Sequence, residues 1–153
     1  MIKIRFAKPN ELKEIKRVYR KAYIQFSKDE IMSYFFGRLS KDKIKNKDIL
    51  VACDESKIIG LCSFSCTPVF ANSIYIEDVV ILKDYRRTGV GLSLIKKVLK
   101  IAKSKGLRRA FTNTWLEHTA SIQLNKKLGF KYCGKIRNVT SEKEDHIFFS
   151  KKL

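Results

Sequence analysis

Residues 75–99, YIEDVVILKDYRRTGVGLSLIKKVL, restrict the fold most, because an apolar run, a basic turn with two glycines and a helical repeat follow one another directly. Residues 74–82 are mostly β-branched or apolar, which is typical of a buried strand, and only Glu77 and Asp78 interrupt them. In residues 92–102, apolar side chains recur at spacings of three and four with lysines between them. This spacing predicts a helix that packs on a sheet.

The turn between the strand and the helix has the composition of an anion-binding loop. It consists of Arg86, Arg87, Thr88, Gly89, Val90 and Gly91. Glycine permits positive φ angles, so consecutive N–H groups at the start of the helix can converge on one anion, and the helix dipole favours a pyrophosphate there. The guanidinium of Arg86 or Arg87 would add charge-assisted hydrogen bonds. The turn matches neither the G-x-G-x-x-G dinucleotide motif nor the P-loop.

Length and composition restrict the class of protein. A chain of 153 residues predicts one domain over residues 1–153, and 44% apolar residues argue against disorder. No apolar run reaches the roughly 20 residues that cross a bilayer, and residues 1–17 lack the apolar core of a signal peptide. We therefore expect a cytoplasmic protein without a membrane partner.

The four cysteines agree with a reducing compartment. Cys62 and Cys66 would lie roughly 13 Å apart along a strand, which is too far for a disulfide or for sharing a metal. Cys53 and Cys133 lie elsewhere in the chain, and no C-x-x-C pair exists. We expect buried free thiols and no metal site.

The net charge of +18 comes from 33 Lys and Arg against 15 Asp and Glu, and it would attract polyanions. The basic residues are spread over every segment, however, and most fit solvated helix faces or the lysine-rich residues 41–47. A specific nucleic-acid partner is therefore not favoured, although it stays open as an alternative.

The remaining periodicities predict a mixed α/β fold with a central mixed β-sheet flanked by helices. Strands are expected at residues 2–7, 49–53, 58–67, 74–82, 108–113, 130–136 and 146–151, and helices at residues 12–26, 31–39, 92–103 and 119–128. Asn10 and Thr119 are the expected caps of the first and last helices, and residues 41–48 are expected to form a polar connection. Tyr34 and Phe35, in the second helix, either pack in the core or line a substrate cleft.

A second motif follows the glycine turn. Residues 119–130, TASIQLNKKLGF, predict a short helix that ends in Gly-Phe before a strand. Together with Arg86-x-x-Gly89-x-Gly91, this motif resembles the GNAT N-acetyltransferase superfamily, and the likeness covers nearly the whole chain. The resemblance implies the GNAT acyl-CoA N-acyltransferase fold, acetyl-CoA as the cosubstrate and an amine as the acceptor.

The resemblance also implies which residues hold the coenzyme. The strand backbone would pair with the pantetheine arm, the N–H groups of the turn would hold the pyrophosphate, and the last helix would touch the coenzyme as well. The residues concerned are Val79, Val80, Ile81, Arg86, Arg87, Thr88, Gly89, Val90, Gly91, Thr119 and Asn125.

Acetyl transfer to an amine needs a base, because an amine of the lysine type has a pKa near ~10.4 and is mostly protonated at neutral pH. Glu77 is the candidate base, directly or through a water, since many members of the family carry an acid at this position. Asp78 points to the opposite face of a regular strand and is the candidate for amine binding. Either acid could instead pair with a nearby Lys or Arg. A strand N–H near Val79 or Val80 would stabilise the oxyanion.

One position departs from the family pattern. Many relatives carry a tyrosine where this chain has Asn125, and that tyrosine is thought to protonate the departing thiolate. An amide is a negligible acid, but a thiol with a pKa near ~8.5 is already a tolerable leaving group. Asn125 is therefore expected to hydrogen-bond the sulfur or a water. Tyr85 and Tyr132 could replace the tyrosine, and both fit structural roles better.

Three further side chains have open roles. His118 is either a second acid or base or an exposed histidine at a helix start. His146 is expected to be structural in an edge strand, and Trp115 either lines the cleft or packs in the core.

The leading hypothesis is an acetyl-CoA-dependent N-acetyltransferase that acts on a primary amine of a small molecule, such as a polyamine or an amino-acid-like compound. Glu77 and Asp78 motivate it, because this pair would attract a cation and, with the downstream Tyr85-Arg86, is similar to diamine and polyamine acetyltransferases. A protein N-terminal or lysine acetyltransferase is the alternative. An acyl-CoA-binding regulatory protein with nucleic-acid affinity is the alternative from another class. A homodimer is left open.

Overall fold

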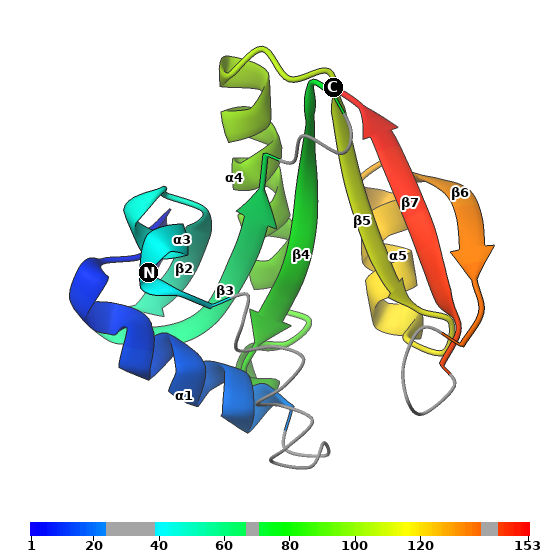
Figure 1. Ribbon diagram of the computed structural model, residues 1–153. Coiled ribbons are helices and arrows are strands. Elements are labelled where there is room, and N and C mark those ends of the chain that lie inside the picture. The colour runs from blue at the N-terminus through cyan, green and yellow to red at the C-terminus, as the bar shows by residue number, and fades with distance from the viewer. Residues whose placement is uncertain (24–38, 67–70, 139–143) are drawn as a thin grey trace. The chain divides into compact units, whose positions relative to one another are not determined.

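The computed structural model describes residues 1–23, 39–66, 71–138 and 144–153 (Figure 1). The strands are β1 (Ile2–Phe6), β2 (Ile49–Asp54), β3 (Lys57–Ser65), β4 (Ser73–Ile81), β5 (Arg109–Trp115), β6 (Lys131–Ile136) and β7 (His146–Lys152). The helices are α1 (Leu12–Ala22), α3 (Lys41–Lys45), α4 (Val90–Ser104) and α5 (Thr119–Lys127), with the short 3₁₀ turns η1 (Pro9–Glu11) and η4 (Lys83–Tyr85). None of the helices in these ranges has the length and apolarity that crossing a bilayer requires. The predictions for Tyr34 and Phe35 lie outside the described residues.

The chain forms two compact units. The first comprises Met1–Phe64 and Asp78–Val98, and the second comprises Ser65–Glu77 and Leu99–Leu153, so β4 and α4 each contribute residues to both. The hydrogen-bonded strand order is β1-β2-β3-β4-β5-β7-β6, with β4 and β5 parallel. Parallel and antiparallel pairs in one strand order, accompanied by helices, confirm the predicted mixed α/β class. One domain over residues 1–153 stays a prediction.

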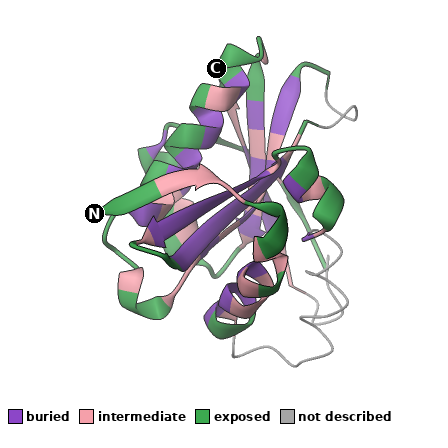
Figure 2. Ribbon diagram, turned by 90° about the vertical axis from the view of Figure 1, so that its left-hand side faces the viewer, coloured by how far each residue is buried: buried purple, intermediate pink, exposed green. Residues whose placement is uncertain are grey.

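In the first unit, α1 buries one side and exposes the other. Ile15, Val18, Tyr19 and Ala22 follow the three- and four-residue spacing of a helix and are buried. Strands β2 and β3 are buried along almost all of their length, which Figure 2 shows in purple. A strand that is covered on both faces needs apolar residues without alternation, and this explains why both strands read as nearly continuous apolar runs.

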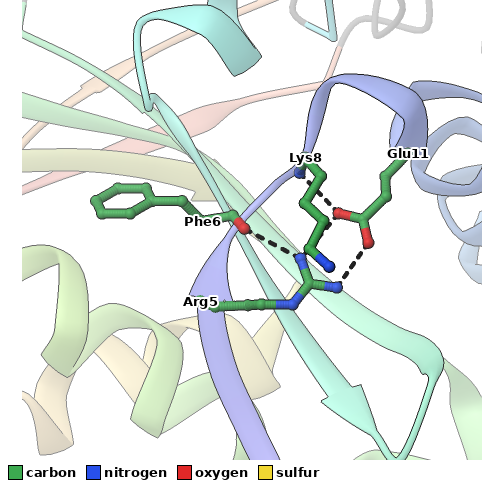
Figure 3. A network of polar contacts seen from close by, with 4 residues as sticks. All are labelled: Arg5, Phe6, Lys8 and Glu11. Carbon is green, nitrogen blue, oxygen red and sulfur yellow. Dashed lines mark hydrogen bonds and ion pairs between the residues drawn. The ribbon is translucent and has the colours of Figure 1, made fainter.

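The start of α1 differs from the predicted cap. Asn10 lies inside η1, and α1 begins two residues later without a side-chain cap, so the prediction of an Asn10 cap is wrong. Glu11 holds this turn instead. Its carboxylate accepts from the Lys8 N–H at 2.7 Å and forms a bidentate pair with the Arg5 guanidinium at 2.6 and 2.8 Å (Figure 3). Pro9 favours the tight turn, because its fixed φ suits helical backbone and it needs no N–H partner.

Residues 41–48, predicted as a polar connection, contain the helix α3, so that prediction is wrong. The Ser40 side chain caps α3 by accepting from the Lys43 N–H at 3.2 Å. Ile44 is buried, and the Lys43 ammonium donates to the carbonyl of Phe64 in β3 at 3.1 Å. One buried apolar residue among lysines gives no helical periodicity, so tertiary contacts decide this helix.

In the second unit, β7 lies between β5 and β6. Strand β5 extends to Trp115, two residues beyond its predicted end, because it pairs with β7 along its whole length. The prediction that His146 belongs to an edge strand is therefore wrong. His146 is buried in an inner strand, and β6 is the edge.

All four cysteines are free thiols, and two of them are buried. Cys53 and Cys62 lie in the buried strands β2 and β3, and burial raises the pKa of the Cys53 thiol. Cys66 follows the end of β3, and Cys133 lies in the edge strand β6; both are exposed. The prediction of buried thiols is therefore wrong for Cys66 and Cys133, since one lies beyond the end of its strand and the other in an edge strand.

Candidate active site

The glycine turn of the first unit has the backbone of an anion-binding loop. After η4 the chain passes through left-handed conformations at Arg87, with a φ of 63°, and at Gly89, with a φ of 88°, and then enters α4. The Ser93 N–H donates to the Gly89 carbonyl at 3.0 Å. Within the described residues, the N–H groups of residues 87–92 donate to no backbone carbonyl. They lie at the positive end of the α4 dipole and are available to an anion.

The two arginines of this turn differ in their contacts. Arg86 donates from Nε to the carbonyl of Ile81, the last residue of β4, at 3.1 Å. Its Nη2 donates to the carbonyl of Ala22, the last residue of α1, at 3.0 Å. Arg87 is exposed, and its guanidinium makes no hydrogen bond or ion pair within the described part of the chain. The sequence did not distinguish the two side chains. In the structure, Arg86 donates hydrogen bonds to two backbone carbonyls.

Hydrogen bonds from neighbouring residues also hold the turn. Thr88 Oγ1 donates to the Tyr85 carbonyl at 2.7 Å, and Tyr85 Oη donates to Asp54 Oδ2 in β2 at 3.1 Å. The hydrogen bond with Asp54 raises the pKa of Tyr85 above the ordinary value of a tyrosine. These contacts favour a structural role for Tyr85. Tyr132, the other tyrosine considered as an acid, is 62% exposed in β6.

Asp78 is the first residue of β4 that belongs to the first unit, and it is 7% exposed. Its Oδ1 accepts from Tyr19 Oη at 3.1 Å, and its Oδ2 accepts from Ser63 Oγ at 3.2 Å. The carboxylate thus joins α1 and β3 to β4. Amine binding by Asp78 stays a prediction, and both of its carboxylate oxygens already accept a hydrogen bond from another side chain.

The end of β4 continues past its pairing with β5. The parallel register joins Ser73–Ile76 to Arg109–Thr112, and residues 79–81 follow it in β4. Val80 is 2% exposed, while its two neighbours are half-buried. Just beyond the strand, the Leu82 N–H donates to a β3 carbonyl at 2.9 Å. Residues 79–81, whose backbone is predicted to pair with pantetheine, thus form the end of β4 and follow the residues that pair with β5.

Glu77 ends the part of β4 that belongs to the second unit. It is half-buried, whereas Ile76 before it and Asp78 after it are buried, as the alternation of a regular strand requires. Tyr75 is also half-buried and lies on the same face of β4 as Glu77. The face that carries the candidate base is therefore the less covered face of the strand.

A polar chain that the sequence did not predict crosses three strands of the second unit. Tyr75 Oη donates to Asn113 Oδ1 in β5, and Asn113 Nδ2 lies 2.7 Å from His146 Nδ1 in β7. The Trp115 and His146 rings meet edge to face with centroids 6.3 Å apart. The chain orients the Asn113 amide between a hydroxyl and an imidazole. These residues are far apart in the sequence and are brought together by the strand order, so their spacing along the chain could not predict the contact.

Helix α5 carries the remaining candidates of the second unit. His118 is its N-cap residue and Thr119 is its first helical residue, so the prediction of a Thr119 cap is wrong. Both are exposed, and His118 Nδ1 lies 3.4 Å from Thr114 Oγ1. Asn125 is 3% exposed, and its backbone carbonyl accepts a hydrogen bond from the Phe130 N–H at 3.0 Å where α5 ends. The roles of Thr119 and Asn125 toward a coenzyme stay predictions.

Residues 12–130 match a family model described as the acetyltransferase (GNAT) family. A thialysine N-epsilon-acetyltransferase of Bos taurus is 33% identical over 70 residues, which cover 46% of this chain and 41% of that protein. An N-alpha-acetyltransferase of Sulfurisphaera tokodaii is 25% identical over 95 residues, which cover 61% of this chain and 57% of that protein. The chain spans three fifths or less of the length of the curated relatives it matches.

The fold also has counterparts among solved structures. The PaiA N-acetyltransferase from Thermoplasma acidophilum, solved in complex with coenzyme A, has a TM-score of 0.78 to this chain. Its sequence is 21% identical, and the match covers 100% of this chain and 99% of that one. A likeness at this identity shows a shared fold.

Proposed function

Because this chain belongs to the acetyltransferase (GNAT) family, we propose that it transfers the acetyl group of acetyl-CoA to a primary amine of a small molecule. The match of the family model to residues 12–130 carries the reaction class. Acetyl-CoA is the cosubstrate of acetyltransferases with this fold, and the geometry of the glycine turn supports its binding here.

The first unit supplies the groups for the coenzyme. The N–H groups of residues 87–92 would bind the pyrophosphate, and the backbone of residues 79–81 would pair with the pantetheine arm as an added strand. The positive end of α4 and the turn's arginines offset the charge of the diphosphate. In the second unit, Thr119 and Asn125 of α5 are the proposed further contacts.

The chemistry requires an uncharged amine. Glu77 takes a proton from the ammonium, directly or through a water, and the amine nitrogen then attacks the thioester carbonyl. A β4 N–H, at Val79 or Val80, donates to the oxyanion of the tetrahedral intermediate. The C–S bond breaks, the attacking nitrogen loses its surplus proton to give the neutral amide, and the sulfur leaves as a thiolate that takes up one proton in exchange. Asn125 would hydrogen-bond this sulfur or a water, because an amide cannot supply the proton itself.

Two observations support a small amine as the acceptor. The relative from Bos taurus is named for a small amino acid, and its identity to this chain is the higher of the two reported. Glu77 also places an acid on the less covered face of β4, which favours a cationic acceptor. The name of the Sulfurisphaera tokodaii relative supports the alternative, a protein N-terminal amine.

The test is release of free thiol from acetyl-CoA with a panel of acceptors: polyamines, free amino acids including thialysine and lysine, amino sugars, aminoglycosides and N-terminal peptides. We expect amine-dependent release with a small cationic amine and little with peptides. Release with peptides alone would replace the small-molecule acceptor by a protein. Coenzyme binding without release from any acceptor, together with salt-sensitive binding to nucleic acid, would favour a regulatory protein.

A further inference from the structure

One end of the second unit gathers basic residues from β5, β6, β7 and α5. The register pairs Arg109, the first residue of β5, with Lys152, the last residue of β7. Lys131, the first residue of β6, pairs with Ser150 of β7, and α5 ends shortly before it at Lys127. The starts of β5 and β6 therefore lie beside the end of β7 (Figure 1). We call this the basic end, and it consists of Arg108, Arg109, Lys127, Lys131, Lys151 and Lys152.

The acids of this unit lie toward its opposite end. Among the described residues, Glu144 and Asp145 precede the start of β7, and Glu117 follows the end of β5. Glu77 comes after the last residue of β4 that pairs with β5. Lys135, toward the far end of β6, pairs with Asp145 at 3.1 Å, whereas no residue of the basic end forms an ion pair within the described part of the chain. The unit's own described acids therefore do not neutralise the basic end.

Like charges face each other at the basic end. Arg109 and Lys152 are both exposed and lie directly opposite in the antiparallel pair of β5 and β7. Like charges in this position destabilise a sheet. The phosphates of a polyanion would offset the repulsion, and their binding would release counterions. The register thus favours a polyanionic partner at this end.

An exposed aromatic ring accompanies these charges. Tyr132 follows Lys131 in the edge strand β6 and is 62% exposed. Its ring contacts the buried ring of Phe149 in β7 edge to face, with the centroids 6.4 Å apart, so the core supports one part of it. Lys151 lies two residues after Phe149, on the same face of β7. An open aromatic ring with lysines nearby is suited to stacking on an unpaired base whose phosphates contact the ammonium groups.

We propose that the basic end of the second unit binds single-stranded RNA, with its cations on the phosphates and Tyr132 stacked on a base. The charge selects a polyanion, and the exposed ring selects unpaired bases, which RNA presents in single strands and loops. In the sequence the basic residues are spread over every segment, and the strand order brings these six to one end. The basic end lies away from Glu77, so RNA binding is independent of the proposed acetyl transfer.

The experiment is fluorescence anisotropy of the whole chain with a short labelled single-stranded RNA, at about 50 and about 200 mM salt, and with the duplex of the same sequence. We expect the single strand to bind about tenfold more tightly than the duplex, because only its bases can stack. Tyr132→Ala should raise the Kd for the single strand about tenfold, and Tyr132→Phe should bind like the wild type. Lys131→Gln, at an exposed position, should raise the Kd at low salt and less at high salt.

A matched pair of double variants tests the location. The variant that combines Arg109→Gln with Lys152→Gln removes two phosphate contacts and should lower the slope of log Kd against log salt by about 1.4. The variant that combines Lys96→Gln with Lys97→Gln removes the same charge from exposed positions on the part of α4 that belongs to the first unit. It should leave the slope nearly unchanged. Circular dichroism checks the folding of every variant.

Four results would overturn the proposal. Equal weakening by the two double variants would mean that net charge, and not the basic end, binds RNA. Wild-type affinity of Tyr132→Ala, or equal affinity for single strand and duplex, would remove the stacked base. Equally tight binding of polyglutamate would make the partner an acidic protein. Binding to vesicles that contain phosphatidylserine without binding to RNA would make it an anionic membrane.

Discussion

Tyr19 Oη donates to Asp78 Oδ1 at 3.1 Å and so joins the last turn of α1 to β4. Ser63 Oγ donates to the other carboxylate oxygen at 3.2 Å. Asp78 is buried, and a buried carboxylate is costly unless donors satisfy it. The contact therefore constrains how α1 and β3 lie on β4 in the first unit.

Tyr19→Phe removes one of these donors and keeps the ring. We expect a loss of about 1–3 kcal/mol in the free energy of unfolding, because a buried charged acceptor loses a hydrogen bond. Urea unfolding measures it. Ser63→Ala is the matched variant for the other oxygen and should cost a similar amount. If both variants were as stable as the wild type, the carboxylate would not depend on these donors.

Glu77→Gln tests the proposed base, because glutamine keeps the shape of the side chain and cannot take a proton. We expect kcat/KM to fall about 10²–10⁴-fold with little change in the Kd for coenzyme A. The measurement is thiol release with the best acceptor of the panel, together with coenzyme titration. Glu117→Gln, at an exposed position before α5, is the control and should retain wild-type turnover. Equal turnover by the Glu77 and Glu117 variants would remove Glu77 from the mechanism.

Gly60 allows β3 and β4 to approach closely. A Cβ at Gly60 would lie 2.6 Å from Ile81 Cδ1 and 2.9 Å from the Val80 carbonyl oxygen. Gly60→Ala would therefore displace β4 and should cost about 1–3 kcal/mol of unfolding free energy. It should also raise the Kd for coenzyme A, because the displaced residues are those proposed to pair with pantetheine.

Gly106→Ala is the comparison for Gly60→Ala. Its Cβ would meet no atom within 4 Å, but its φ of 73° disfavours alanine, so it should lose about 1 kcal/mol of stability. It should leave the coenzyme affinity unchanged. Denaturant unfolding and coenzyme titration of both variants measure the two effects. Equal affinity of both variants would contradict the placement of pantetheine on β4.

The Arg5–Glu11 pair makes stability depend on pH. The hydrogen bonds from Arg5 lower the pKa of Glu11 below its ordinary value. The pair therefore stabilises the fold at pH values above the unfolded pKa of about 4.3, and this contribution is lost as the pH falls through the lower pKa of the folded state. Glu11→Gln should cost about 1 kcal/mol at pH 7, a figure reduced for solvent because the Arg5 side chain is 34% exposed. Urea unfolding from pH 7 to pH 2 should show this difference shrinking in acid.

The Glu14–Arg17 pair on α1 is the matched control for that series. Its side chains are 38% and 41% exposed, and exposed pairs contribute little. Glu14→Gln should change the unfolding free energy by no more than about 0.5 kcal/mol at any pH. If Glu11→Gln and Glu14→Gln lowered the unfolding free energy equally, the burial of Glu11 would not strengthen its ion pair with Arg5.

Local patterns predicted the elements well where periodicity was strong. The alternation and apolar runs of β2, β3 and β4, and the three- and four-residue spacing of α4, match the structure closely. Helix α1 begins at Leu12 as predicted but ends at Ala22, before the predicted end at residue 26. The helix starts were predicted less well, because Glu11 is held by Arg5 from another strand and His118 precedes the expected cap. Helix α3 was missed, because it depends on the burial of one residue, Ile44, and its sequence has no helical repeat of apolar residues.

For the candidate site, the linear motif predicted that residues 86–91 form a turn before a helix. In the structure α4 already begins at Val90, and the Arg86 N–H donates to the Lys83 carbonyl at 3.2 Å, whereas the N–H groups of residues 87–91 are open as expected. The motif could not distinguish Arg86 from Arg87, because the difference lies in carbonyls of α1 and β4. It also could not show that Asp78 accepts from Tyr19, which lies 59 residues earlier. Such contacts depend on which segments the fold brings together.

The sequence by itself determined the fold class, the turn at the start of α4 and the family, because backbone preference, side-chain periodicity and glycine conformation act over a few neighbouring residues. Only the tertiary structure decided that β7 lies between β5 and β6, that Asn113 bridges Tyr75 and His146, and that Arg86 holds the end of α1. Strand order and the direction of long polar side chains are set by the burial of distant apolar surfaces. That burial couples residues regardless of their separation along the chain.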